Sequence, residues 1–198
     1  MLPFGLEVTQ KPTVLPVPLS GPGSIREHLR ILGRDALDST LEELIWQAVE
    51  NIEPLTLHSA TTTSYAMTLD RFADYTGTSI LKLPRFPVQS VTGIQYIDVE
   101  KANITLSPSL YQLSRSRVPS RIAPIDGQMW PFTSVFSLGA VRVEFTAGYA
   151  TADAMPRLYK QAIKYLVAQL YYGDRMTLDD SFQKCIRGLK KMGFTSWS

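Results

Sequence analysis

Cysteine and histidine are scarce in this sequence. Among its 198 residues, one is a cysteine and two are histidines. An internal disulfide is therefore impossible, and neither His28 nor His58 has a second histidine or a cysteine at metal-ligand spacing. The lone Cys185 falls on the apolar side of an expected helix, where a free cysteine acts as a small hydrophobic residue. We expect no disulfide and no metal site, and a reducing compartment suits the chain.

Long apolar runs and a strong charge imbalance are also missing. No stretch approaches the roughly 20 apolar residues that a membrane helix needs. Prolines interrupt the apolar residues near the N-terminus, so this segment does not resemble a signal peptide. The formal net charge of +2 is too small for a protein that coats nucleic acid. We expect a soluble protein without a membrane partner, made and used in a cytoplasm.

Catalytic motifs are absent from the sequence as well. It contains no phosphate-binding glycine loop, no Gly-x-Ser-x-Gly elbow and no His-Glu-x-x-His pair. Asp70 and Asp74 could form a general acid/base pair, but they flank an expected turn, where aspartate commonly bonds to the nearby backbone. We therefore predict no catalytic residue and no cofactor, which means a protein that is not an enzyme.

The apolar residues follow helical spacing at both ends of the chain and alternate in the middle. Capping boxes at Ser24–Glu27 and Ser39–Glu42 predict two helices in residues 24–57, with Pro54 ending the second. Alternation over residues 58–150 predicts an antiparallel sheet or small barrel. Helical spacing predicts a core helix in residues 151–173 and a C-terminal helix and tail in residues 174–198. The expected fold is α+β, with the β-rich block inserted into a small helical bundle. The expected strands lie at residues 65–69, 80–83, 91–97, 104–106, 111–113 and 141–145.

Two segments have no regular pattern. Residues 1–23 contain five prolines and three glycines, which predicts an extended arm, with residues 1–12 either docked or disordered. Residues 115–139 form a long loop that carries Trp130, Phe132 and Phe136. A loop this apolar has to be covered, either by its own sheet or by a neighbouring chain.

Charge is segregated between two of the expected helices. The second helix carries four glutamates and no basic residue, namely Glu42, Glu43, Glu50 and Glu53. The C-terminal helix has a basic side opposite its apolar side, formed by Lys184, Arg187, Lys190 and Lys191. Complementary faces of this kind favour register and specificity between subunits.

Five segments, in sequence order, resemble the head–tail connector (neck adaptor) proteins of tailed bacteriophages. Residues 83–98 (LPRFPVQSVTGIQYID) resemble the family stretch LPRPPVQSVTSIxYxD. Residues 121–131 (RIAPIDGQMWP) resemble its xIxPxxGxxWP loop, and residues 141–149 (VRVEFTAGY) its VxVxFTAGY strand and turn. Residues 158–163 (LYKQAI) are similar to its PLKQAI helix start, and residues 17–31 to its VSLAEAKxHLRI start.

The resemblance implies a structural subunit of the virion. Such adaptors form a ring, usually a dodecamer, below the portal protein at the capsid vertex. The ring joins the portal to the next neck or stopper protein and leaves a channel through which DNA passes without sequence-specific binding. The location implied is the head–tail junction of the virion, after assembly in the host cytoplasm.

The family resemblance and the residue pattern together suggest two sets of contact residues. Glu42, Glu43, Glu50 and Glu53 are the candidates for a channel-facing wall, since like charge lets DNA slide. The candidates for the subunit or portal interface are Trp130, Phe132, Phe136, Phe182, Lys184, Arg187, Leu189, Lys191 and Trp197. The alternatives are another neck or tail protein, such as a head-completion or tail-terminator protein, or a ligand-binding module that uses the aromatic loop.

Overall fold

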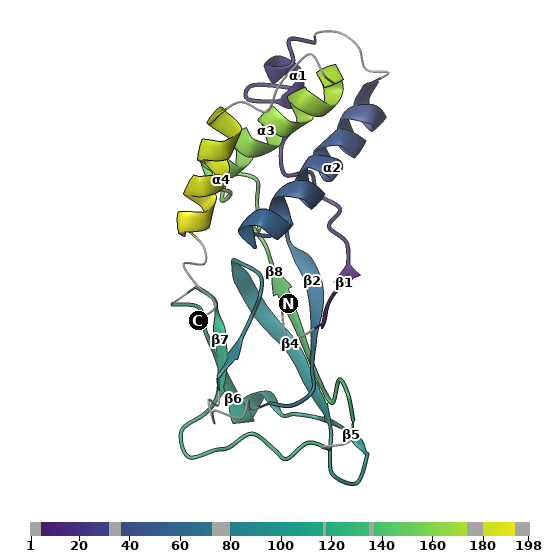
Figure 1. The fold of residues 1–198 in the computed structure, drawn as a ribbon, viewed down its shortest axis with the longest axis vertical. Coiled ribbons are helices and arrows are strands. Elements are labelled where there is room, and N and C mark those ends of the chain that lie inside the picture. The colour runs from purple at the N-terminus through teal and green to yellow at the C-terminus, as the bar shows by residue number, and fades with distance from the viewer. Residues whose placement is uncertain are drawn as a thin grey trace. The chain divides into compact units, whose positions relative to one another are not determined.

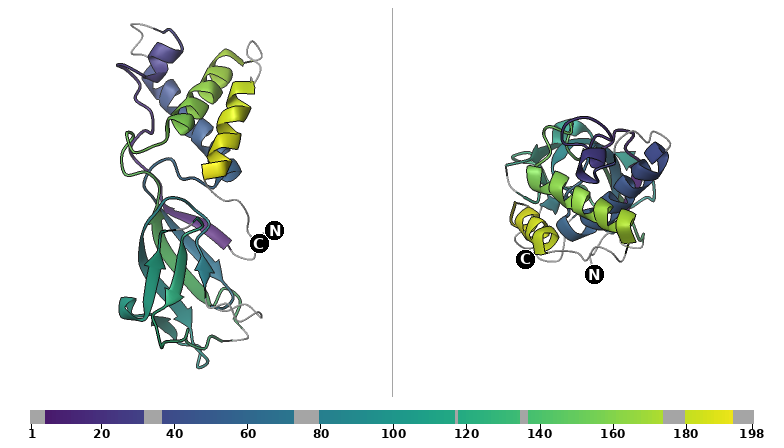
Figure 2. Two further views of the ribbon diagram at one scale, coloured as in Figure 1. Left: turned by 90° about the vertical axis from the view of Figure 1, so that its left-hand side faces the viewer. Right: turned by 90° about the horizontal axis from the view of Figure 1, so that it is seen from above.

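The structure, a computed structural model, describes residues 5–31, 37–72, 80–116, 118–134, 137–173 and 180–192. The chain divides into two units, each built from segments that are distant in the sequence. The β unit comprises Met1–Lys11 and Thr62–Gly148, and the helical unit comprises Pro12–Thr61 and Tyr149–Ser198. Figures 1 and 2 show the helices gathered in one unit and the strands in the other. The predicted α+β fold, with an antiparallel β-rich block inserted into a helical bundle, is confirmed.

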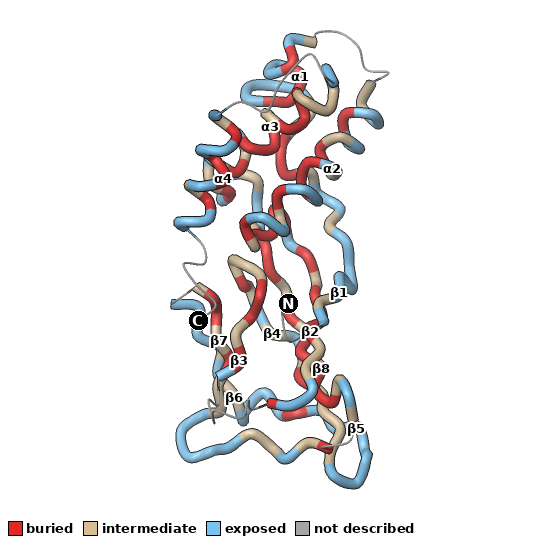
Figure 3. Tube along the Cα trace, viewed as in Figure 1, coloured by how far each residue is buried: buried red, intermediate tan, exposed pale blue. Residues whose placement is uncertain are grey.

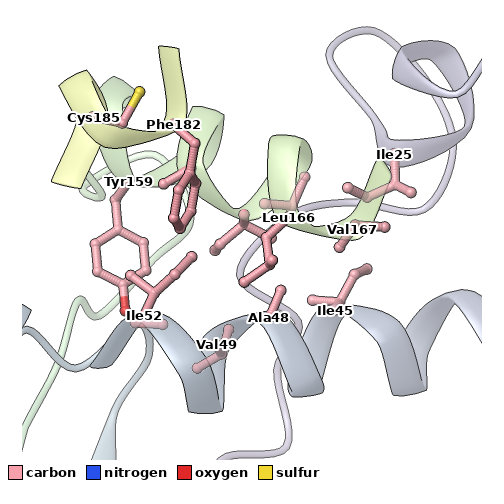
Figure 4. Close-up of a cluster of buried hydrophobic side chains, with 14 of the residues drawn as sticks. Ile25, Ile45, Ala48, Val49, Ile52, Tyr159, Leu166, Val167, Phe182 and Cys185 are labelled. Atoms are coloured by element: carbon pink, nitrogen blue, oxygen red, sulfur yellow. The ribbon is translucent and has the colours of Figure 1, made fainter. Parts of the chain in front are cut away.

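The helical unit is held together by apolar stripes on its helices. The second helix, α2, buries Leu41, Ile45, Ala48, Val49 and Ile52, which recur every three or four residues. Figure 4 shows side chains of α2 pointing toward side chains of α3 and α4 in one shared core. In the described residues the α-helices are α1 (Ile25–His28), α2 (Asp38–Thr56), α3 (Arg157–Tyr172) and α4 (Asp180–Met192).

The first capping box forms, but its helix is short. The Ser24 Oγ accepts a hydrogen bond from the Glu27 backbone N–H at 3.2 Å, as a capping residue should. The helix ends at His28, and Arg30 has a positive φ of 55°. This left-handed residue is incompatible with a continuing right-handed helix, so α1 has a single turn.

The ends of α2 differ from the prediction. The helix begins at Asp38 with Leu37 as its cap, so the expected box starting at Ser39 is not formed. Pro54 lies inside the last turn and does not end the helix. Its missing N–H removes only one bond near the end, and the Leu57 N–H still donates to the Glu53 carbonyl at 2.8 Å. The prediction that Pro54 ends the helix is therefore wrong.

The β unit contains two antiparallel sheets around one core. The five-stranded sheet has the order β1-β2-β8-β4-β5 and the three-stranded sheet has the order β3-β7-β6. Side chains from both sheets, among them Ile94, Phe145, Leu83 and Ile122, are buried together. Along β8 buried residues alternate with partly buried ones, as a sheet with one covered face requires, and Figure 3 shows buried residues along the central strands of this unit. The strands are β1 (Gly5–Gln10), β2 (Thr63–Leu69), β3 (Leu81–Lys82), β4 (Val88–Ile97), β5 (Asn103–Thr105), β6 (Tyr111–Ser114), β7 (Arg121–Pro124) and β8 (Val141–Ala147).

Two strands lie where the sequence predicts irregular structure. Strand β7 falls inside the expected loop 115–139 and pairs with both β3 and β6. Its four residues are too few to show an alternating pattern, although Ile122 is fully buried. Strand β1 falls inside the expected N-terminal arm and pairs with β2. Most of its side chains are exposed, so β1 also lacks the alternation of a half-buried strand.

Candidate assembly surfaces

Helix α4 has one buried face and one charged face. Phe182 and Leu189 point into the helical core, with exposed fractions of 4% and 0%. They pack there with Cys185 and Ile186 from the same helix. The prediction that Phe182 and Leu189 contact a partner directly therefore does not fit this structure, because their side chains are already covered by their own chain. Their apolar character serves the core.

The basic side chains of α4 face solvent. Lys184, Arg187 and Lys191 are exposed, and so is Lys190. The Arg187 Nε donates to the Gln183 carbonyl at 3.3 Å, one turn earlier in the helix. Within the described part of the chain, Lys184, Arg187 and Lys191 form no ion pair. These three side chains therefore give α4 an exposed positive face.

The acidic side chains of α2 fall into two groups. Glu42, Glu43 and Glu50 are exposed, and α2 contains no lysine or arginine that could neutralise them. Glu53 is half-buried, and its Oε1 accepts a hydrogen bond from the Ala60 backbone N–H at 2.9 Å. Glu53 thus fixes the connection from α2 toward β2, a role that the sequence alone did not suggest.

Two aromatic residues of the loop 115–139, Trp130 and Phe132, differ in how far they are covered by their own chain. The Trp130 ring stacks on Phe72, with centroids 4.7 Å apart and planes 3° apart. Phe132, two residues later, leaves 83% of its area exposed. Trp130 therefore stabilises its own loop, whereas Phe132 is covered by little of the described chain. Phe136 and Trp197, the other aromatic candidates, lie outside the described residues.

Two further exposed apolar residues of the same loop were not predicted. Met129 is 84% exposed and Leu138 is 90% exposed. The Asp70 Oδ1 accepts a hydrogen bond from the Gly139 N–H at 2.8 Å, and this bond holds the end of the loop. Asp70 therefore has a local structural partner. Methionine and leucine carry no positional signal in an irregular segment, so only the structure separates them from core residues.

A buried histidine–tyrosine pair joins two segments of the helical unit. The His58 Nδ1 lies 2.9 Å from the Tyr149 hydroxyl, and both rings stack with centroids 6.2 Å apart. Burial lowers the pKa of His58, an effect partly offset by a hydrogen bond to the Leu189 backbone. Burial also raises the pKa of Tyr149 to about 12. Because His58 is fully buried, the pair can stabilise the fold but cannot reach a substrate in this conformation.

Reactive and metal-binding groups are few in the described residues. Burial raises the pKa of the Cys185 thiol, which lowers its fraction of reactive thiolate. Across the described ranges, no three His, Cys, Asp or Glu residues are grouped as metal ligands. No helix in those ranges is long and apolar enough to span a membrane.

Comparisons with known proteins add information at the level of the fold. The sequence matches no protein-family model and no curated protein. A chain in the structure of the neck of the empty gene transfer agent (GTA) particle, computed with C6 symmetry, is similar at a TM-score of 0.71. The protein described here therefore has the same fold as that chain of the GTA neck. The two sequences are 23% identical, and the similarity covers 94% of this chain and 95% of the other.

Two further GTA structures give the same result. A chain of the native GTA virion is similar at a TM-score of 0.71 with 23% identity, over 93% of this chain and 94% of the other. A chain of the native GTA neck, computed with C12 symmetry, has a TM-score of 0.67 and 20% identity over the same shares. The fold that the connector resemblance implies thus agrees with the fold of neck subunits along nearly the whole chain.

Proposed function

We propose that this protein is a structural head–tail connector subunit of a tailed phage or a phage-like particle. The observation that carries the proposal is the fold shared with GTA neck chains over 94% of the sequence. The five connector-like sequence segments support the same function independently. A structural role also agrees with the sequence, in which no catalytic constellation is found.

The proposed subunit works in a ring below a portal protein. The GTA neck structures are computed with C6 and C12 symmetry, which supports a ring and favours a dodecamer. A ring requires one face of a subunit to fit a different face of the next. The exposed cations Lys184, Arg187 and Lys191 form a face suited to an acidic surface of a neighbouring subunit or of the portal. Phe132 adds an exposed aromatic contact, a type enriched at interface centres.

The ring is proposed to leave a channel for DNA. Glu42, Glu43 and Glu50 are the residues that we propose to face this channel, because carboxylates repel phosphates and let DNA slide. Glu53 lies on the same helix, but its carboxylate is bonded to the Ala60 N–H. The channel proposal therefore rests on the other three glutamates.

Native mass spectrometry and electron microscopy test the connector function. We expect the purified full chain to form an annulus, either alone or when mixed with portal rings from the same particle. A chain that remains monomeric in the presence of portal rings would contradict the connector function.

A pair of charge reversals tests the basic face of α4. Arg187→Glu should weaken assembly at least tenfold, because it places a carboxylate against an acidic partner surface. Arg157→Glu is the matched control, because it makes the same charge change at an exposed residue of α3. Equal assembly of both variants would exclude Arg187 from the interface. Deleting α4 is a poorer test, because it also removes four core residues, among them Phe182 and Leu189.

A further inference from the structure

Strand β1 is attached to its sheet mainly through its backbone. It lies at the edge of the five-stranded sheet and pairs only with β2, from Gly5 opposite Thr68 to Gln10 opposite Ser64. Leu6 is half-buried and packs against the core, whereas the other four side chains of β1 are exposed, and among these Glu7 accepts from the Arg142 guanidinium of β8 at 3.4 Å. A backbone ladder of this kind fits any copy of β2 equally well.

The segment that follows β1 is the least restrained crossing between the two units. Residues 12–14 form no hydrogen bond with any other described residue, and Val14 is 65% exposed, whereas Leu15 packs against the helical core and Pro16 is buried. The other two crossings are held within the β unit by Gln89. Its Nε2 donates to the Thr62 hydroxyl at 2.7 Å and to the Gly148 carbonyl at 2.8 Å. Only the crossing after β1 can therefore change direction without breaking a described hydrogen bond.

Exchange of such a strand between copies changes few contacts. A β1 strand that pairs with the β2 of a neighbouring copy makes the same backbone bonds as in its own sheet. The two arrangements differ mainly in the strain of the connecting segment and in the local concentration of the second copy. A short connection favours exchange, and a ring holds neighbouring copies close together.

We propose that β1 is exchanged in the assembled ring, so that residues 5–10 of one copy pair with β2 of the next copy. This inference rests on the proposed ring function. Each copy then gives one strand and receives one, so a closed ring leaves no β2 edge without a partner. An open chain of copies leaves one such edge exposed, which disfavours incomplete assemblies.

Engineered cysteines at one paired position test the exchange. A Cβ placed on Gly5 lies 3.8 Å from the Cβ of Thr68. This distance is near the roughly 3.8 Å mean for a disulfide, so Gly5→Cys and Thr68→Cys can be linked. Both variants also carry Cys185→Ala to remove the natural thiol. Copies with Gly5→Cys are mixed with copies with Thr68→Cys, assembled and oxidised, and then separated on a denaturing gel without reductant.

The mixture can form a disulfide between residues 5 and 68 only if the strand is exchanged. We expect a covalent dimer from the mixture and a ladder of linked copies from the double variant. The matched control mixes Gly5→Cys with Thr105→Cys, on the opposite edge strand β5, and should give no dimer. Equal dimer yields in the test and control mixtures would overturn the proposal.

Native mass spectrometry of the same samples separates the two possible failures. Assembled rings in which the double variant is linked only within each copy overturn the strand exchange and leave the connector function intact. A protein that stays monomeric beside portal rings, with only internal links, overturns both.

Discussion

The two units of the molecule treat their apolar side chains differently. In the helical unit most large apolar residues of α2, α3 and α4 are directed into the core, and most of the exposed charged side chains lie on the other faces of these helices. In the β unit a loop anchored by Trp130 leaves Met129, Phe132 and Leu138 more than four-fifths exposed. The helical unit is therefore suited to contacts guided by charge, and the loop of the β unit to contacts that bury apolar area.

This difference has a consequence for assembly. Charged contacts accelerate encounter and select the partner, whereas buried aromatic anchors supply most of the affinity of an interface. Salt should therefore weaken contacts of the helical unit more than contacts of the β-unit loop. The proposed ring would combine both kinds of contact.

A substitution in the core of the helical unit should cause the largest loss of stability. Phe182→Ala should lower the free energy of unfolding by about 3–5 kcal/mol, since it leaves a cavity where an aromatic ring packs. Gln183→Ala, at an exposed position next to it, should change this value by less than about 0.5 kcal/mol. Urea unfolding followed by circular dichroism measures both. A small effect of Phe182→Ala would restore this residue as an interface candidate.

The loop of the β unit gives an intermediate effect. Trp130→Ala should cost about 1–3 kcal/mol, because the ring is half-buried and stacks on Phe72. Phe132→Ala should leave stability within about 0.5 kcal/mol and weaken assembly instead, because its ring touches little of its own chain. Thermal unfolding and native mass spectrometry of the two variants separate the roles. If Phe132→Ala unfolded as easily as Trp130→Ala, the contrast between anchor and contact residue would be lost.

The sequence predicts those elements that are long and have one buried face. The stripe of α2 and the alternation of β8 are visible in the sequence because each burial pattern is regular. Strand β1 could not be found this way, since its attachment comes from backbone pairing and leaves its side chains exposed. Strand β7 is missed for a different reason, because its four residues are too few to show an alternating pattern and it lies between two partner strands.

The composition of the candidate surfaces remains a prediction, and the structure adds which of their described residues are covered by the chain itself. The sequence places Phe182 and Lys184 in the same helix, yet helical periodicity alone does not say which apolar residues are covered by the chain itself. The sequence likewise does not show which of Trp130 and Phe132 is covered, because both lie in an irregular segment. Only the stacking of Trp130 on Phe72 in the structure distinguishes them. Long-range contacts decide these roles, and a single sequence does not encode them in a local pattern.

The histidine–tyrosine pair of the helical unit gives the smallest effect, a dependence of stability on pH. Burial lowers the folded-state pKa of His58 below its ordinary value of 6.5, so the unfolded chain binds a proton more readily. Stability should therefore be constant above pH 6.5 and fall as the pH drops toward the lowered pKa, by at most about 1.4 kcal/mol per pH unit. Tyr149, with a pKa of about 12, stays neutral throughout this range.

Urea unfolding between about pH 5 and pH 8 measures the dependence, which His58→Gln should flatten. His28→Gln is the control, because burial also lowers the pKa of His28 but this residue lies apart from the pair. If His58→Gln kept the full dependence and His28→Gln removed it, the acid sensitivity of the helical unit would belong to α1 and not to the segments that lead into and out of the β unit.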